Sequence, residues 1–153
     1  MRKESILDGR VNLLVPGNLV KLTQDDLITA YSNERQRPDY IFEDKANGAK
    51  IAINYHASKA SDKDLPEIKA YFEKLYQSMT HDFISSDYKS IKGKRFVVMQ
   101  FELKDPNSDG KIYNYAFFTS LDGKLLLTDY SFPASQASKC LIQANAIIDS
   151  FQN

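Results

Sequence analysis

The chain has 153 residues, the size of one ordinary domain, and a chain of this length buries enough surface to fold without a metal or a disulfide. Its 20 basic and 20 acidic side chains give a formal net charge of zero, which argues against a general nucleic-acid-binding protein, since such proteins carry a basic excess. The single cysteine, Cys140, excludes an internal disulfide and any paired-cysteine metal site.

The ends and the continuity of the sequence bear on compartment and organisation. The charged start of the chain is not followed by an apolar stretch, so no signal peptide is predicted. No apolar run reaches the length of a membrane span. No linker, internal repeat or low-complexity segment interrupts the sequence. We therefore expect one cytoplasmic domain over residues 1–153.

Near the N-terminus, the sequence predicts one strand followed by a short helix. The apolar run at residues 10–15 ends at Pro16 and Gly17 and has the composition of a strand. Residues 23–32 predict a helix, because Thr23 suits the N-cap position and two aspartates follow it at the positive end of the helix dipole.

A hairpin and a second helix follow. Asn47 and Gly48 separate the β-rich residues 40–44 from residues 49–56, and this dipeptide is typical of a tight turn, because both of its residues tolerate positive φ. Further on, Asp64 suits a helix cap, and the proline two residues later suits the first turn. The helix that they open carries one apolar row at helical spacing, formed by Leu65, Ile68, Tyr71, Phe72, Leu75, Tyr76 and Met79.

The second half of the chain predicts four strands and a final helix. The strands are expected at residues 83–91, 94–103, 111–121 and 124–132, and the short turns between them force antiparallel neighbours. Apolar residues recur at helical spacing over residues 135–151. Together the elements predict an α+β fold, in which a mostly antiparallel sheet of about six or seven strands carries helices on both faces.

The turn at Asp122 and Gly123 predicts the register of the last two strands. In a two-residue hairpin Leu121 faces Lys124, and pairing proceeds outward from there. One face of the two strands is then polar at the end far from the turn. The other face is strongly aromatic and carries Tyr113, Tyr115, Phe117, Tyr130 and Phe132.

The order of the elements resembles the PsbP-like superfamily. The resemblance is carried by the opening RVNLLVP at residues 10–16, by GKIYNYAF at residues 110–117, and by the strand and helix that close the chain. This superfamily includes a plant photosystem extrinsic protein, a yeast Ran-binding import factor and bacterial DcrB- and EagR-like proteins. The resemblance implies an α/β/α sandwich and a non-catalytic adaptor, in some members a chaperone or partner of a secreted effector. It implies no catalytic residues.

The features that resemble metal sites have simpler interpretations. Residues 105–110 (DPNSDG) match the first half of a calcium-binding loop, but Ala116 occupies the position of its bidentate glutamate. Strands flank the segment, so we interpret it as a hairpin turn. His56 and His81 lie on different segments without a second histidine at metal spacing, and we expect both at the surface. We expect no metal site and no cofactor.

Two further features have structural interpretations. Cys140 lies on the apolar row of the last helix, so we expect a buried, inert thiol. Basic residues gather around Gly93; such a cluster could contact an acidic partner or RNA, but we interpret it as a charged hairpin turn. The sequence has no glycine-rich phosphate loop and no nucleophile-elbow motif.

We therefore expect a non-catalytic protein-binding module, in the role of an adaptor, a chaperone or an immunity-type partner of a secreted effector. Its partner-binding residues are predicted to be Tyr113, Tyr115 and Tyr130, because tyrosine combines apolar contact area with a hydroxyl that stays hydrated. If helices cover this face completely, these rings are core residues instead. The alternative functions are a carrier of a small apolar ligand and an enzyme without a recognisable motif.

The calcium-like loop generates a first prediction. We expect it to bind no calcium with useful affinity, because Ala116 cannot supply the bidentate carboxylate of the motif. Isothermal titration of the protein with calcium should give no saturable heat. A micromolar site that disappears in the Asp105→Ala variant would contradict this interpretation.

Overall fold

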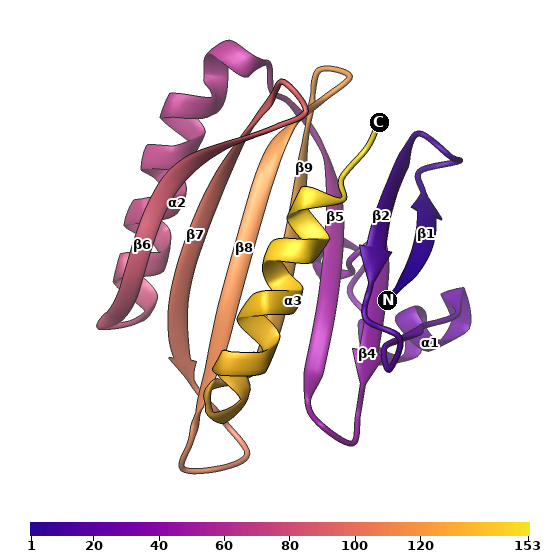
Figure 1. Cartoon of the computed structure of the whole chain (residues 1–153), viewed down its shortest axis with the longest axis vertical. Helices are drawn as coiled ribbons and strands as arrows, with labels where there is room; N and C mark the ends of the chain where they lie inside the picture. The colour runs from indigo at the N-terminus through magenta and orange to yellow at the C-terminus, as the bar shows by residue number, and fades with distance from the viewer.

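The structure is a computed structural model that describes the backbone of all 153 residues and every side chain except that of Ala57. It confirms the predicted α+β class: seven antiparallel strands form one sheet in the order β3-β4-β5-β9-β8-β7-β6, with helices on both faces (Figure 1). The strands are β1 (Arg2–Ile6), β2 (Val11–Val15), β3 (Val20–Lys21), β4 (Tyr40–Asp44), β5 (Ala49–Lys59), β6 (Asp82–Ile91), β7 (Lys94–Lys104), β8 (Lys111–Leu121) and β9 (Lys124–Pro133). The α-helices are α1 (Gln24–Ala30), α2 (Leu65–Met79) and α3 (Ala137–Asp149).

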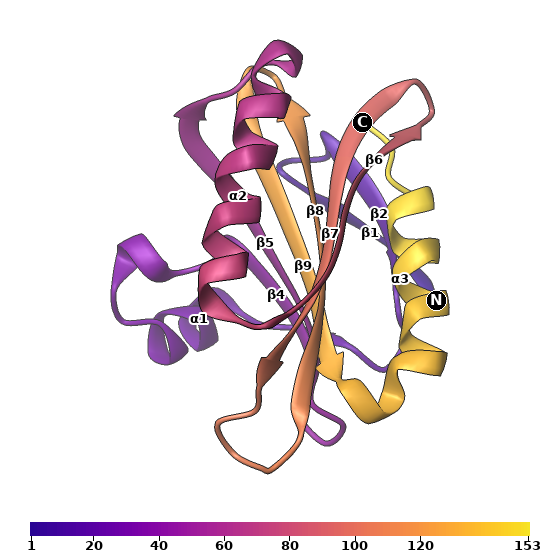
Figure 2. The ribbon, with the colours of Figure 1, turned by 90° about the vertical axis from the view of Figure 1, so that its left-hand side faces the viewer.

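The helices divide between the two faces of the sheet. Figure 2 shows α1 and α2 on one face, and α3 with the β1–β2 hairpin on the other. No helix in the described part of the chain combines the length and the apolar character that crossing a membrane requires.

The turn chemistry confirms the predicted register. Asp122 and Gly123 have φ values of 50° and 77°, the left-handed conformation that a tight two-residue hairpin needs. Leu121 pairs with Lys124, and the pairing continues outward without a break to the far end of β9. At the N-terminal helix, the Thr23 hydroxyl accepts a hydrogen bond from the Asp26 amide at 3.1 Å, so the predicted cap is also confirmed.

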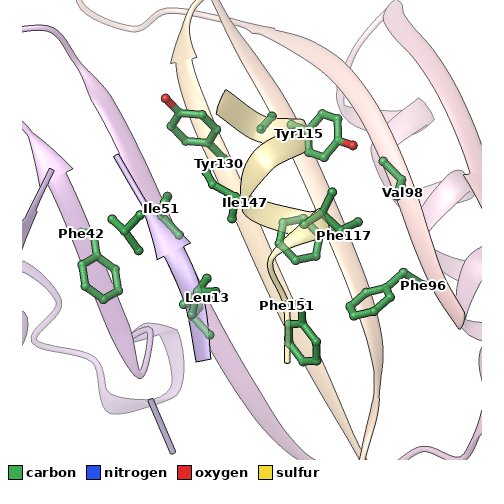
Figure 3. Close-up of a cluster of buried hydrophobic side chains, with 14 of the residues drawn as sticks. Leu13, Phe42, Ile51, Phe96, Val98, Tyr115, Phe117, Tyr130, Ile147 and Phe151 are labelled. Atoms are coloured by element: carbon green, nitrogen blue, oxygen red, sulfur yellow. The ribbon is translucent and has the colours of Figure 1, made fainter. Parts of the chain in front are cut away.

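The larger core lies between the sheet and α3, with the β1–β2 hairpin beside the helix. Phe151 packs edge-to-face on Phe96, with ring centroids 4.9 Å apart, and Phe117 and Ile147 lie in the same cluster (Figure 3). Burying one such side chain fully contributes about 1.5–3 kcal/mol. The fully buried residues of this core include Val11, Val15, Leu19, Phe42, Ile51, Ile53, Phe132, Ala144, Ile147 and Ile148.

The basic residues around Gly93 hold the end of α3 in place. The Lys92 ammonium donates to the backbone carbonyls of Asp149 and Phe151 at 3.1 and 3.0 Å, where the negative end of the helix dipole favours a cation. The Lys89 ammonium lies 2.9 Å from an Asp149 carboxylate oxygen. The charged turn between β6 and β7 therefore anchors the last helix, which gives this basic cluster a structural role.

A smaller core lies under α2 on the opposite face. The Tyr76 ring stacks on Phe101 with centroids 4.2 Å apart, and Phe72 packs on Phe118 at 5.0 Å. Leu65 at the start of the helix is fully buried. The residues buried in this cluster are Ala60, Leu65, Val97, Met99, Phe118 and Leu125.

Two local predictions need correction. Residues 2–6 form strand β1, which no pattern in the sequence predicts, because three consecutive charged residues open it and it has no apolar run. The strand pairs with β2 in a separate two-stranded sheet. Asp64 does not cap α2 with its side chain. Its carboxylate instead accepts hydrogen bonds from the Ser61 amide and hydroxyl, and so it stabilises the 3-10 turn that precedes the helix.

Candidate functional site

Helix α2 exposes part of its apolar row. Leu65, Phe72 and Tyr76 face the sheet, whereas Tyr71, Leu75 and Met79 keep 63%, 37% and 53% of their surface exposed. At 3.6 residues per turn, Tyr71 and Leu75 lie roughly 80–120° around the helix axis from Leu65. The row is therefore wider than the contact that the sheet offers, and one flank of it remains in solvent.

This flank forms one wall of a groove, which we call the α2 groove. Its volume is about 590 Å³. The opposite wall is the end of β5, and Leu125 of β9 contributes a buried apolar surface to it. The residues that line the groove are His56, Ser58, Lys59, Ala60, Glu67, Ile68, Tyr71, Phe72, Leu75 and Leu125.

An irregularity in β5 shapes the second wall. The pairing of β5 with β9 shifts register between Tyr55 and Lys59, the stretch that borders the groove. Such a bulge re-aims side chains and is common beside functional sites. Ser120 supports the wall from the sheet, since its hydroxyl donates to the Ala60 carbonyl at 2.7 Å.

The groove combines apolar surface with charged side chains at its rim. Its surface is mainly apolar, and the charged side chains of Lys59 and Glu67 are exposed beside it. Among the residues that the structure describes, no cluster of three histidine, cysteine or acidic side chains could hold a metal ion. The groove can therefore accept large apolar side chains and pair charges at its rim.

The structure places the three tyrosines predicted to bind a partner beneath α3. Tyr113, Tyr115 and Tyr130 are only 6%, 3% and 1% exposed, so the expectation that this face stays reachable is corrected. The β1–β2 hairpin, whose first strand the sequence does not predict, lies beside α3 and closes the rest of this face. Direct contact of these residues with a partner stays a prediction.

The hydroxyl groups of the same tyrosines are all paired. Tyr115 donates to Asn145 Oδ1 at 3.2 Å, Tyr130 donates to Gln143 Oε1 at 2.8 Å, and Tyr113 donates to Gln100 Oε1. Burial, followed by the charge of Asp149, raises the pKa of Tyr115 to about 12. The aromatic face is thus built as a hydrogen-bonded layer between the sheet and α3.

The two histidines, the cysteine and the calcium-like loop have the positions that the sequence predicts. His56 and His81 are exposed, and Cys140 is buried beside the core under α3, as expected. In the loop after β7, the Asp105 carboxylate accepts hydrogen bonds from the Asn107 amide and the Ser108 hydroxyl, both at 2.9 Å. These bonds are those of an ordinary turn, and they favour the hairpin interpretation.

An acidic side chain on the α2 face lies in an environment that disfavours its charged form. Asp129 of β9 pairs between Ala52 and Ala116, and its Oδ1 has no hydrogen-bond partner among the described residues. Burial raises the pKa of Asp129 to about 6, and the charge of Lys50 partly opposes this shift. Burial, and then the charge of Asp129, also raises the pKa of Tyr76.

The ring of Tyr115 is buried and that of Tyr71 is exposed, so removing each ring should have a different effect on stability. Tyr115→Ala should lose about 3–5 kcal/mol of unfolding free energy, because it removes a buried ring, whereas Tyr71→Ala should lose only about 0.5 kcal/mol. Urea unfolding of both variants and the wild type measures the difference. Similar losses in the two variants would contradict the assignment of Tyr115 to the core.

The environment of Asp129 predicts a pH dependence. Because its folded-state pKa lies above the value near 3.8 of an unperturbed aspartate, its contribution to stability is fully present below about pH 4 and is lost as the pH rises through about 6. Asp129→Asn should therefore match the wild type near pH 4 and exceed it by about 2 kcal/mol at pH 7. Denaturant unfolding at both pH values tests this, with Asp62→Asn, an exposed site, as the control. A stability difference that does not change with pH would contradict the shift.

Comparisons with known proteins support the fold at low sequence identity. The chain is similar to the cyanobacterial PsbP protein, CyanoP, of Synechocystis sp. PCC 6803, with a TM-score of 0.65, 16% identity and coverage of 99% of this chain and 91% of that one. It is similar to the Ran-binding protein Mog1p of Saccharomyces cerevisiae, with a TM-score of 0.61, 12% identity and coverage of 99% and 94%. PA94 of Pseudomonas aeruginosa, a putative regulator of unknown function, matches with a TM-score of 0.55, 12% identity and coverage of 100% and 96%.

No family model and no curated protein matches the sequence. The structural matches extend over nearly the whole of each chain, and they agree with the resemblance that the order of the elements predicts. The chain therefore has the Mog1p/PsbP-like fold.

Proposed function

We propose that this protein is a non-catalytic protein-binding module, and that the α2 groove receives a segment of its partner. The observation that carries the proposal is the exposed flank of α2, where the large apolar side chains of Tyr71 and Leu75 line a groove of about 590 Å³. Exposed apolar patches on a folded domain commonly mark sites of protein interaction.

The shape of the groove favours a protein segment over a small ligand. Binding sites for small molecules bury most of the ligand surface, about 70–90%. Here one wall is a helix flank whose Tyr71 side chain is 63% exposed, so a small molecule would remain largely in solvent. A segment of a larger partner can bind here, because the rest of the partner's fold covers the side of the segment that faces away from the groove.

The residues along the groove indicate what kind of partner segment is complementary to it. The α2 residues that line the groove run from Glu67 to Leu75, a rise of about 12 Å, which matches two turns of a second helix. Lys59 and Glu67 are exposed where they line the groove. A helical segment with two or three large apolar side chains, flanked by one acidic and one basic residue, is complementary to this surface.

The biological role that we propose is that of an adaptor, a chaperone or an immunity-type partner of a secreted effector. Support comes from the fold, since one protein of similar structure, Mog1p, is a Ran-binding protein. A groove with an apolar floor suits an adaptor or chaperone, because it can cover an apolar segment of another protein. The cytoplasm is the compartment that we propose.

Variant-dependent capture from native lysate tests this proposal. Immobilised wild-type protein should retain a partner that Tyr71→Lys binds at least about tenfold more weakly, because the lysine removes an anchor and adds a charge to the apolar wall. Ile142→Lys is the matched control: Ile142 is 74% exposed on α3, on the opposite face of the sheet. The captured protein is then purified and titrated against all three proteins.

The outcomes separate the candidate functions. A secreted effector that binds the wild type and Ile142→Lys equally, but Tyr71→Lys weakly, supports the proposal. Equal binding to all three proteins contradicts the assignment of the groove. If no protein is retained, and a fluorescent fatty acid binds the wild type but not Tyr71→Lys, the protein is a carrier of an apolar ligand instead.

A further inference from the structure

The seven-stranded sheet has one long open edge. Strand β6 pairs with β7 on one side only, and it is ten residues long, whereas the strand at the other edge, β3, has two residues. Proteins usually shorten or cover such edges, or protect them with proline, bulges or charged side chains, because unpaired backbone groups recruit another strand. Strand β6 contains no proline, and Figure 1 shows it as the outermost strand of the sheet.

The turn that follows β6 determines which of its backbone groups face the open edge. Lys92 and Gly93 form a two-residue turn with φ values of 50° and 80°, so Ile91 and Lys94 exchange both of their hydrogen bonds. Because antiparallel pairs alternate, Ser86, Tyr88 and Ser90 direct their N–H and C=O groups outward. This regular edge ends where the register shifts between Phe83 and Ser85.

We propose that β6 pairs antiparallel with β6 of a second copy of this chain, about a two-fold axis at Tyr88. In this register, Tyr88 bonds the partner's Tyr88, and Ser86 bonds the partner's Ser90. Asp87 then lies opposite the partner's Lys89, and the symmetry repeats this pair. An isologous contact of this kind closes as a dimer and leaves no further edge of the same type.

Charge selects this register over its neighbours. A two-fold axis at residue 87 also satisfies the outward backbone groups, but it sets Asp87 against the partner's Asp87. An axis at residue 89 sets Lys89 against the partner's Lys89. Like charges directly opposite across two strands are destabilising, and opposite charges contribute about 0.2–1 kcal/mol for each pair. The axis at Tyr88 gives two attractive pairs and no repulsive pair.

The side chains at this edge are available for pairing. Asp87 is exposed and has no ion-pair partner among the described side chains. Lys89 is 35% exposed in its contact with Asp149, and its three N–H donors can serve a second carboxylate. The Tyr88 ring is 38% exposed and held by the Arg95 guanidinium, 3.6 Å from its centroid.

The proposed dimer does not depend on the function of the α2 groove. The two-fold axis is perpendicular to the sheet, so each face of one sheet continues into the same face of the other. The two copies of α2 therefore lie on the same side of the dimer. The α2 grooves are thus presented on one side of a sheet with twice seven strands. A bivalent surface of this kind raises avidity for a partner with two binding segments.

Sedimentation of charge-swapped variants tests the pairing. The wild type should be a dimer within the range of about 1–100 µM, and Asp87→Lys and Lys89→Asp should each dimerise about tenfold more weakly, because each sets like charges opposite one another. An equimolar mixture of the two variants should recover the wild-type affinity as a heterodimer, since every lysine then faces an aspartate. Asp62→Lys, the same charge change at an exposed site far from β6 in the sequence, should dimerise as the wild type does.

Three results would overturn the proposal. The first is a wild-type protein that stays monomeric over the whole concentration range. This result also contradicts the proposal if the β6 edge instead pairs with a strand of another protein. The second is a dimer whose affinity Asp87→Lys does not change. The third is a mixture of the two variants that stays as weak as its components, because a general loss of folding would give that result and charge pairing would not.

Discussion

The packing of α3 against the aromatic face of β8 and β9 is the contact on which the rest of this structure depends. The face is built by a tight hairpin, and the helix that covers it is anchored at its end by Lys92 and by the pairing of Asn12 with Gln152. Both anchors join segments that are far apart in the sequence. Closing this layer therefore joins the N-terminal hairpin, the central sheet and the C-terminus into one cooperative unit.

The other face of the sheet is covered less completely. Helix α2 lies over β6 and β7, and its apolar row is wider than the strip of sheet that it contacts. The excess forms a wall with β5 and Leu125 instead of a core. Asp129, on the same face, is partly buried; its Oδ1 has no hydrogen-bond partner among the described residues, and burial raises the pKa of the carboxyl group. The α2 face thus combines exposed apolar side chains with a carboxyl group whose charged form is disfavoured by burial.

Local chemistry in the sequence accounts for much of the fold. Asp122 and Gly123 determine a turn, and the turn determines the register of two strands, so the alternation of Tyr115 with its neighbours follows from a few residues. The helices follow from caps and apolar periodicity. The pairing of β5 with β9 and the placement of β1 depend instead on long-range contacts, which no short pattern encodes.

The candidate site was harder to predict for the same reason. Periodicity shows which residues share a face, but not how much of that face another element covers. The aromatic face of β8 and the apolar row of α2 look alike in sequence, yet Tyr115 is buried and Tyr71 is exposed. The available signal was the width of the α2 row, since Tyr71 and Leu75 lie too far around the helix to contact the same sheet as Leu65.

Helix α3 seals one face of the sheet, whereas α2 leaves an apolar flank in solvent. Relaxation of tyrosine ring protons by a soluble paramagnetic probe measures this directly, because the effect falls steeply with distance from solvent. This difference in coverage predicts strong broadening of the Tyr71 ring signals and protection of Tyr115 and Tyr130 in the same sample. Broadening of Tyr115 and Tyr130 to the level of Tyr71 would contradict it.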